Sequence, residues 1–247
     1  MEAAPADLRY AGMIAALAAR HAQPLWDRYH RITTREPCAP DAPMVWPWAD
    51  MEPLVERAAR EVALEDAERR VLLLTHPAFQ GRAATTTNLL GGLQTLLPGE
   101  TARAHRHSLQ AIRFVMSGAG AETSVNQHRC PMDEGDLVLT PAWTWHEHVH
   151  RGSQRMVWLD GLDLPLMHHL DSMFFEIAGP DPDLAVPQPS AATLCDAAMA
   201  ELGPDPDDTG GAEPNRYRYA WQRARPALAE APARADGSRW LRYVDAR

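Results

Sequence analysis

The chain has 247 residues, of which 45% are hydrophobic and 23% are charged, which is typical of a folded globular protein and not of a disordered one. Its formal net charge of -9 and its scattered arginines make nucleic acid an unexpected partner. No apolar run approaches the roughly 18 to 20 residues that cross a bilayer, and the first residues have no signal-peptide pattern. We therefore expect a cytoplasmic protein that is not bound to a membrane.

The first part of the chain has two segments in which apolar residues recur at helical intervals. One runs from Asp7 to Ala22, and the other runs from Leu54 to Val62 after Asp50, which we interpret as its N-cap. Between them, Pro37 to Trp48 holds four prolines and two tryptophans and predicts an extended arm laid over a surface. We therefore interpret residues 1–68 as a region of helices and an arm outside the core.

Short segments of strand character, separated by turn residues, follow this region. They are Arg70–Leu74, Leu93–Leu97, Ile112–Met116, Glu122–Val125, Leu137–Thr140 and Met156–Leu159. Short strands at intervals of roughly 8 to 12 residues are typical of a sandwich or barrel. We therefore predict an all-β domain over residues 69–176.

The composition changes after Ile177, where prolines, acidic residues and glycines dominate. We interpret residues 177–247 as a linker and extension, with helices predicted at Ala191–Leu202 and Tyr219–Ala229. The segment Trp240–Val244 has the character of a strand.

Two pairs of histidines at alternate positions form the most informative pattern in the chain. They are His105 with His107 in the segment Ala104–Met116, and His146 with His148 in the segment Leu137–Val149. Both segments have strand character, and a hairpin signal at Asn126–Gln127 lies between them. Successive side chains of a strand point to opposite faces, so the two imidazoles of each pair share a face. Clustered imidazoles favour iron, copper, nickel or zinc, and we therefore predict a mononuclear metal centre.

The spacing around these histidines resembles the two sequence motifs of the cupin superfamily. The matching positions are Gly99, His105, His107 and Gly118 for the first motif, and Gly135, Pro141 and His146 for the second. The resemblance implies a cupin double-stranded β-helix, or jelly roll, with an all-β core, N-terminal helices and a Pro-rich C-terminal extension. Ala111 stands where many cupins have a glutamate ligand, and Trp143 stands where the second motif usually has glycine. The implied metal site therefore has three histidines and no carboxylate.

Three longer segments of the sequence resemble those of the gentisate 1,2-dioxygenases and their relatives, at residues 104–114, 139–148 and 158–163. The resemblance implies that His105, His107 and His146 bind Fe(II) in an extradiol-type, ring-cleaving oxidoreductase of aromatic-acid catabolism. Its substrates would be dioxygen and gentisate (2,5-dihydroxybenzoate), with maleylpyruvate as the product. Salicylate and 1-hydroxy-2-naphthoate are the alternative aromatic acids.

The charge of such a site agrees with an ortho-hydroxy acid as the substrate. Three neutral imidazoles leave a divalent iron with its full positive charge, and a chelating carboxylate and phenolate would neutralise it. Because the chain has no lysine, arginine is the only permanent cation that can meet an anion. Arg113 follows His107 by six residues and is expected on the same strand face, where its guanidinium would bind the carboxylate.

Further residues around the metal are assigned more indirectly. His148 is expected to hydrogen-bond or deprotonate a ring hydroxyl, and Asp160 to orient His148 or to accept a proton from the distal hydroxyl. Family similarity also brings Gln94 and Arg69 to the edge of the pocket. In the alternative reading, Arg113 pairs with a carboxylate of the core and Asp160 forms an ordinary Asp-Gly turn.

The relatives have two cupins, the second of which follows a linker that Tyr217–Val244 resembles. The chain ends at Arg247, so we expect the second cupin to be absent. In the family the cupins pack together and contribute to oligomers, and we expect a homo-oligomer here. The alternative to an enzyme is a non-catalytic single cupin that binds a metal, either as a sensor or as a truncated remnant.

Overall fold

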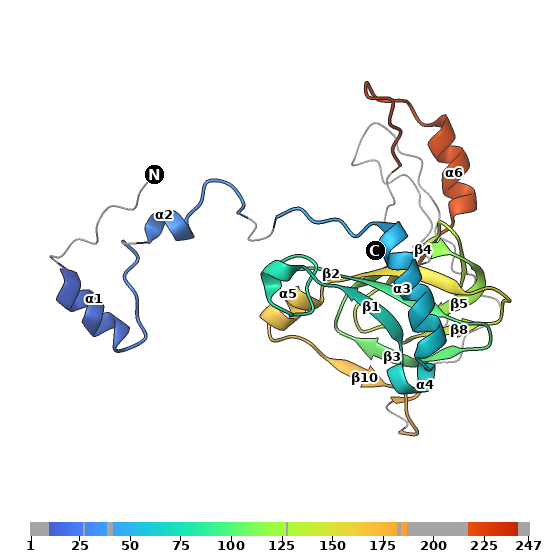
Figure 1. Cartoon of the computed structure of the whole chain (residues 1–247), viewed down its shortest axis with the longest axis horizontal. Coiled ribbons are helices and arrows are strands. Elements are labelled where there is room, and N and C mark those ends of the chain that lie inside the picture. Colours follow the sequence, from blue (N-terminus) through green and yellow to red (C-terminus); the bar gives the residue numbers. More distant parts are fainter. Residues whose placement is uncertain are drawn as a thin grey trace. The chain divides into compact units, whose positions relative to one another are not determined.

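The computed structural model describes residues 10–26, 28–38, 42–126, 128–181, 184–186 and 217–241. The chain divides into two units, Met1–Pro40 and Asp41–Arg247, which we describe separately (Figure 1). The first unit contains two short helices, α1 (Ala11–Ala18) and α2 (Tyr29–Ile32). Of its described residues only Pro24 is buried, so this unit has no core of its own.

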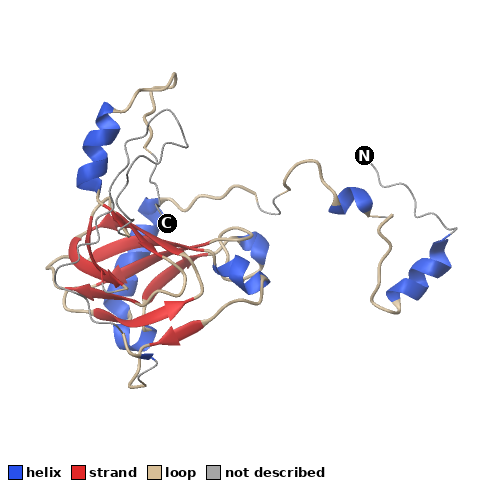
Figure 2. Ribbon diagram, turned by 180° about the vertical axis from the view of Figure 1, so that it is seen from behind, coloured by secondary structure: helices blue, strands red, loops and turns tan. Residues whose placement is uncertain are grey.

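Two antiparallel sheets form the second unit, as Figure 2 shows from behind. The first sheet has the order β1 (Arg70–Leu74), β2 (Leu90–Leu96), β9 (Met156–Leu162), β4 (Ala111–Ser117), β7 (Leu137–Thr140) and β11 (Arg218–Tyr219). The second has the order β10 (Phe175–Ile177), β3 (Thr101–His107), β8 (His146–His150), β5 (Ala119–Val125) and β6 (His128–Asp133). Apart from the pairs β1–β2 and β5–β6, neighbouring strands in each sheet are not consecutive in the sequence, as in a jelly roll. The predicted all-β core of this type is confirmed.

The segment predicted as one strand from Ala104 to Met116 is two strands in different sheets. β3 ends at His107, and the chain crosses to the other sheet before β4 begins. Two residues of the connection between β3 and β4 form hydrogen bonds with other segments. Ser108 Oγ donates to the Ser172 carbonyl, and Gln110 N donates to the Asp163 carboxylate. The prediction that Arg113 shares a strand with His107 is therefore wrong.

The segment Leu137–Val149 is divided in the same way, into β7 and β8. The predicted hairpin before it is confirmed, because β5 pairs with β6 with Val125 opposite His128. Asn126 has a φ of 44°, a left-handed conformation that asparagine tolerates better than most residues. Gln127 lies outside the described residues.

The core lies between the two sheets, and a second apolar layer lies on the outer face of the larger sheet. Leu96, Val115, Val138 and Trp158 are among the buried residues of the inner cluster. On the outer face, helix α3 (Trp48–Glu61) contacts β1 and β2 (Figure 1) and places Val55 against their apolar side chains. The inner cluster is itself buried, so the space between the sheets can hold polar groups away from water.

Helix α3 starts earlier than the sequence predicts. Its N-cap is Pro47, so the prediction of Asp50 as the N-cap is wrong. Asp50 lies in the first turn, where a negative charge interacts favourably with the helix dipole. The fixed φ of proline suits the start of a helix and explains the shift of the boundary. A short helix, α4 (Leu64–Ala67), leads from α3 to β1.

The described part of the C-terminal region packs on the larger sheet. Arg218 in β11 forms ion pairs with Asp136 at 2.7 Å and with Asp133 at 3.2 Å. The helix predicted at Tyr219–Ala229 is confirmed as α6 (Trp221–Glu230). Trp240 and Leu241 are not in a strand, and the predicted helix Ala191–Leu202 lies outside the described residues.

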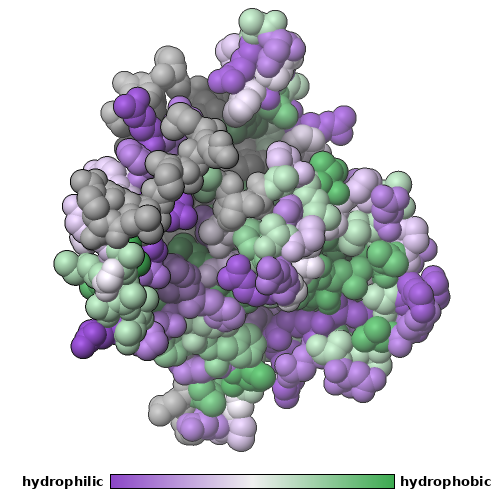
Figure 3. Space-filling model, turned by 60° about the vertical axis from the view of Figure 1, so that its left-hand side comes forward, coloured by the Kyte–Doolittle hydropathy of each residue, from purple (hydrophilic) through white to green (hydrophobic). Residues whose placement is uncertain are grey.

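The described surface is mixed in polarity, and hydrophilic and hydrophobic residues both reach the face shown in Figure 3.

Helix α5 (Leu164–His169) connects β9 to β10. Among the described residues, no helix is long and apolar enough to cross a membrane.

Two glycines of the predicted cupin motifs differ in how closely other atoms of the fold approach them. Gly99 and Gly118 both have positive φ, of 84° and 94°, but only Gly118 is crowded. A Cβ on Gly118 would lie 2.4 Å from the Arg155 carbonyl oxygen, whereas a Cβ on Gly99 would meet nothing within 4 Å. We expect Gly99→Ala to lower the free energy of unfolding by about 1 to 2 kcal/mol, the cost of the left-handed backbone alone.

Gly118→Ala should lower the same free energy by about 2 to 4 kcal/mol, because steric overlap is added to that cost. Urea denaturation of the wild-type protein and both variants measures the difference. Equal losses in the two variants would contradict the close approach of Gly118 to β9.

Candidate metal centre

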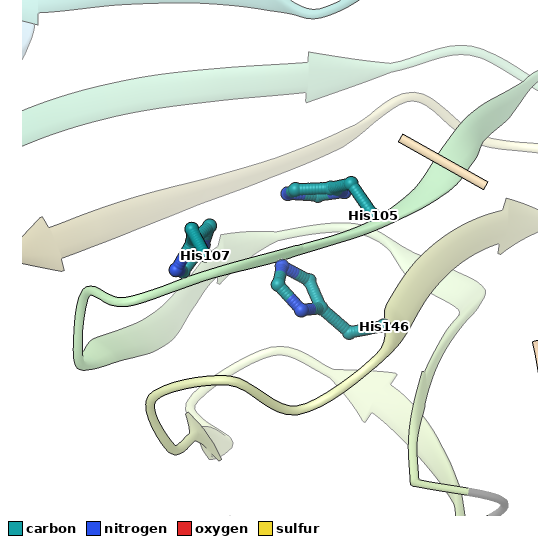
Figure 4. A group of neighbouring side chains, drawn as sticks. All are labelled: His105, His107 and His146. Carbon is teal, nitrogen blue, oxygen red and sulfur yellow. The ribbon is translucent and has the colours of Figure 1, made fainter. Parts of the chain in front are cut away.

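Three of the predicted histidines come together at one point between the sheets. His105 and His107 extend from β3, and His146 lies opposite His105 on the neighbouring strand β8. All three are buried, and potential ligand atoms of the three rings lie within 4.8 Å of one another. Figure 4 shows the three rings directed toward a common centre. The alternation of side chains along a strand brings the first two to one face, and strand pairing adds the third.

Hydrogen bonds turn the same ring nitrogen of each histidine away from this centre. Nδ1 faces the carbonyl oxygen of Arg103 in His105, at 3.2 Å, and that of Leu109 in His107, at 3.1 Å. Nδ1 of His146 faces the carbonyl oxygen of Thr144 at 2.9 Å. A carbonyl only accepts, so in His107 and His146 these contacts favour a proton on Nδ1 and a lone pair on Nε2. Nδ1 of His105 also lies 2.5 Å from Arg69 Nη2, which can only donate, so the hydrogen bonds of His105 do not select one tautomer. The chemistry of the donor set, three converging imidazoles, fits a metal ion.

The environment keeps these imidazoles uncharged. Burial and, to a smaller extent, the positive charge of Arg69 lower the pKa of His105 to about 2. Burial and the nearby Arg113 lower the pKa of His107 to about 4. The pKa of His146 is also well below its ordinary value, chiefly because of burial. Neutral imidazole is the form that binds metals.

A buried ion pair reaches this centre from the opposite sheet. Arg113 on β4 lies opposite Asp160 on β9, and Arg113 Nε is 3.2 Å from Asp160 Oδ1. The guanidinium also bonds the Thr140 hydroxyl, and Trp158 Nε1 donates to Asp160 Oδ2 at 3.2 Å. Burial raises the pKa of Asp160 to about 6, although Arg113 opposes this shift. Burial lowers the pKa of Arg113 in turn.

The contacts of Arg113 agree with the alternative interpretation of the sequence, and its role in substrate binding stays a prediction. Arg113 pairs with a core carboxylate, as the alternative reading proposed, and that carboxylate belongs to another predicted site residue. It also faces the inner side of the sheets, although it comes from the other sheet and not from the strand of His107.

The remaining predicted residues surround the same inner space. His148 is fully buried on β8, and its Nδ1 lies 2.8 Å from the Thr123 hydroxyl oxygen. Within the described part of the chain, His148 is thus oriented by Thr123 and has no hydrogen bond to Asp160. Arg69 immediately precedes β1 and donates from Nη2 to the Arg103 carbonyl oxygen at 3.0 Å.

Six buried side-chain atoms among the described residues have no hydrogen-bond partner, and all belong to predicted site residues. They are Arg69 Nε, Gln94 Nε2, Arg113 Nε, His146 Nε2, His148 Nε2 and Asp160 Oδ1. An unsatisfied buried polar group costs about 1 to 3 kcal/mol, and such groups are rare outside functional sites. Their concentration here supports a site built to receive a metal ion and a polar ligand.

Several contacts of the site have no signal in the sequence. The hydroxyls of Thr123 and Thr140 bond site residues, but a threonine inside a strand reads as an ordinary strand former. Phe175 on β10 stacks on His105, with ring centroids 5.2 Å apart and planes inclined by 30°. Its strand follows a helix and a turn, so its pairing with β3 could not be inferred from spacing.

The backbone conformation at Trp143 explains why the second cupin motif usually has glycine at this position. Its φ is 62°, a conformation that is strained for a bulky side chain. The backbone N of Trp143 donates to the His107 carbonyl oxygen at 2.6 Å, so this turn is tied to the end of β3. The guanidinium of Arg106 lies over the Trp143 ring, 4.6 Å from its centroid, and this cation–π contact offsets part of the strain.

Comparisons with known proteins agree with this geometry. Residues 92–162 match the family described as "Cupin domain". The chain is 38% identical over 205 residues to gentisate 1,2-dioxygenase 1 of Aquipseudomonas alcaligenes, covering 83% of this chain and 58% of the relative. It is 34% identical over 236 residues to a 5-aminosalicylate 1,2-dioxygenase of Comamonas sp., covering 90% and 59%.

A solved structure gives a similar result. The crystal structure of a salicylate 1,2-dioxygenase from Pseudaminobacter salicylatoxidans has a TM-score of 0.75 and 32% sequence identity, over 94% of this chain and 68% of that protein. The chain spans less than two thirds of the length of the curated relatives named above.

The metal centre predicts different effects for His146 and His148, two of the three histidines of β8. We expect His146→Ala to abolish retention of Fe(II), because it removes one of three converging donors, and His105→Ala to do the same. His148→Ala should retain the metal, because its imidazole is outside the converging group. Anaerobic dialysis followed by metal analysis measures the stoichiometry. Retention by the first two variants, or loss in the third, would contradict this division.

The lowered histidine pKa values predict that the metal-free protein is less stable in acid. The pKa values of His105 and His107, about 2 and about 4, lie below the ordinary value of 6.5. As the pH falls through 6.5, the unfolded chain binds protons that the folded chain does not, so the free energy of unfolding decreases. Asp160, with its pKa raised to about 6, acts in the opposite direction but is a single group.

Denaturant titrations of the metal-free protein between about pH 7 and pH 4 measure this slope. The matched variant His107→Gln removes one titrating group and should show a shallower slope. An identical slope in both proteins would contradict the assignment of the effect to the buried imidazoles.

Proposed function

Because the chain belongs to the gentisate 1,2-dioxygenase family of cupin proteins, we propose that it is an Fe(II)-dependent, ring-cleaving dioxygenase of gentisate. The proposed product is maleylpyruvate, formed by opening the ring between the carboxyl-bearing and hydroxyl-bearing carbons. Relatives named for 5-aminosalicylate and salicylate make other ortho-hydroxy aromatic acids the alternative substrates. The observation that carries the proposal is a three-histidine site without a carboxylate, faced by a buried arginine.

The absence of a carboxylate from the metal-ligating group gives a physical reason to expect an anionic, chelating substrate. His105, His107 and His146 are neutral, so they would leave the full charge of a divalent metal uncompensated. A carboxylate and an adjacent phenolate supply two negative donors at one edge of the ring. When bound, Fe(II) would supply the redox chemistry that joins the electron-rich ring to dioxygen.

Arg113 is the proposed binding group for the substrate carboxylate. The residue is 3% exposed, and Nε has no hydrogen-bond partner although it lies near Asp160. A guanidinium held in a dry site binds a carboxylate with two parallel hydrogen bonds. The bond from Arg113 to the Thr140 hydroxyl limits the rotation of its fork. This arrangement orients the acid before the reaction begins.

Asp160 and His148 are the proposed catalytic residues. Burial raises the pKa of Asp160 to about 6, which suits a carboxylate that accepts a proton from a substrate hydroxyl near neutral pH. His148 presents an unpartnered Nε2 to the same space and is proposed to contact a ring hydroxyl. Gln94 and Arg69, each with one unpartnered nitrogen, are proposed to complete the substrate pocket.

A non-catalytic metal-binding cupin is the weaker alternative. Metal binding alone does not require Arg113, Asp160 or His148, and their burial with unsatisfied atoms has a cost. Selection for a chemical role accounts for that cost, whereas selection for metal binding does not.

We also propose that the protein is a cytoplasmic homo-oligomer. The described residues of the first unit, Met1–Pro40, form no core, and they include exposed apolar side chains such as Trp26, Tyr29 and Ile32. A second subunit would cover such side chains and remove them from water.

The experiment that tests the proposed enzyme uses protein loaded anaerobically with Fe(II). Gentisate, salicylate and 1-hydroxy-2-naphthoate are added separately in air, while oxygen uptake and the ring-opened product are followed. We expect one dioxygen consumed for each ring opened, with gentisate as the fastest substrate. No turnover of any of the three by folded, iron-replete protein would contradict the proposal.

An Arg113 variant in the same assay tests the division of labour. Arg113→Met should keep iron and raise KM for the acid by at least about tenfold, because the charged hydrogen bonds to the carboxylate are lost. Since this change also leaves Asp160 without its ion-pair partner, the matched control is the double variant Arg113→Met with Asp160→Asn. Because Asp160 is itself a proposed catalytic residue, this control is compared by anaerobic equilibrium binding of the acid and not by turnover. Loss of iron with an unchanged KM would contradict the assignment.

A further inference from the structure

The contacts of His148 continue beyond Thr123 to a sulfur atom. The Thr123 hydroxyl oxygen lies 2.8 Å from His148 Nδ1 and 3.0 Å from Met132 Sδ. All three side chains are completely buried. Thr123 lies directly opposite His148 in the pairing of β5 with β8, and Met132 comes from β6 on the other side of β5. The three residues thus form a line across one sheet, closed to water.

The number of protons in this line limits its hydrogen-bonding patterns. The hydroxyl has a single proton, the neutral ring has one, and the thioether can only accept. If the ring proton is on Nδ1, it is donated to Thr123, and the hydroxyl proton is donated to Met132. If the ring proton is on Nε2, the hydroxyl must donate to Nδ1, and Met132 accepts nothing. The first pattern has two hydrogen bonds and the second has one.

The electrostatics on the other side of the ring favour the same pattern. His148 Nε2 is buried without a partner and is subject to the positive charges of Arg113 and Arg69. A lone pair directed toward these cations is stabilised, whereas an N–H would be repelled. A divalent metal on the neighbouring triad would strengthen this preference.

We propose that Thr123 and Met132 hold His148 as the tautomer protonated on Nδ1, which makes Nε2 a hydrogen-bond acceptor directed into the active site. Thr123 is therefore a positioning residue that acts through His148. An acceptor nitrogen binds a hydroxyl and rejects a carboxylate oxygen. This pattern assigns the hydroxyl of the substrate to His148 and the carboxylate to Arg113.

The substrate part of this inference rests on the proposed function, whereas the tautomer does not. An ortho-hydroxy acid carries a hydroxyl and a carboxylate at adjacent ring positions, and Nε2 of His148 would accept the hydroxyl proton as the phenolate of the proposed chelate forms, while Arg113 donates to the carboxylate. An aromatic acid without the hydroxyl would satisfy Arg113 but leave Nε2 of His148 without a partner. The site would thus discriminate against an acid without the hydroxyl because that acid leaves a polar atom of the protein unpaired, and not because of the size of the acid.

Nitrogen NMR of the histidine side chains tests the tautomer directly. The protein is labelled with ¹⁵N-histidine and loaded with Zn(II), a diamagnetic ion, and a His148→Gln variant assigns the signal. We expect Nε2 of His148 to be unprotonated in the wild-type protein. The matched variants are Thr123→Val, which removes the hydroxyl at nearly equal volume, and Thr123→Ser, which retains it.

Thr123→Val should move the His148 proton partly to Nε2, and Thr123→Ser should leave it on Nδ1. Met132→Leu should cause a smaller shift in the direction of Thr123→Val, because the hydroxyl is then free to donate to Nδ1. A wild-type ring protonated on Nε2, or an unchanged tautomer in Thr123→Val, would overturn the proposal. These outcomes do not depend on turnover, so they are separate from any failure of the dioxygenase assay.

Kinetics of the Fe(II)-loaded variants test the consequence for the substrate. Thr123→Val should lower kcat/KM for the preferred hydroxy acid by about tenfold or more, with unchanged metal content. Inhibition by benzoate, which has no hydroxyl, should stay the same, and Thr123→Ser should remain within about twofold of the wild-type protein. A merely structural role would weaken benzoate as much as the hydroxy acid, and that result would overturn the assignment.

Discussion

The buried ion pair between Arg113 and Asp160 is the constraint on which the rest of the site depends. Two opposite charges between the sheets are tolerated only if their remaining polar atoms find partners. The protein supplies some of these, from the Thr140 hydroxyl and the Trp158 indole, and leaves the others directed at the inner space. The positive charge of Arg113 also lowers the pKa values of the facing histidines, so it helps to keep them in the form that binds a metal.

The jelly roll divides the chemistry between its two sheets. The smaller sheet carries the imidazoles of His105, His107 and His146 on adjacent strands, and the larger sheet carries Arg113 and Asp160 on another adjacent pair. A metal ion and an anion would therefore be held by different walls of one interior. Because both walls are hydrogen-bonded sheets, the distances between their groups are set by rigid elements and not by loops.

Threonine hydroxyls complete this interior without being part of the proposed chemistry. Thr140 bonds Arg113, and Thr123 bonds His148, each from a strand adjacent in its sheet. Both are fully buried, where a hydroxyl is retained only if it is hydrogen-bonded. The relatives named for gentisate, 5-aminosalicylate and salicylate act on aromatic acids that differ in their ring substituents.

The alternation of His105 with His107 was sufficient to predict that their imidazoles share a face, because side-chain direction along a strand has a period of two residues and depends on local geometry alone. The jelly roll and the choice of His146 as the third ligand were predicted from the resemblance of the motifs to those of cupins. The tertiary structure was required for Arg113, which reaches the site from a different sheet than His107, and for Thr123 and Thr140, which resemble any other strand residue. Those contacts join strands that are distant in the sequence. Spacing along the chain contains no information about them, because strand order is set by packing of the whole domain.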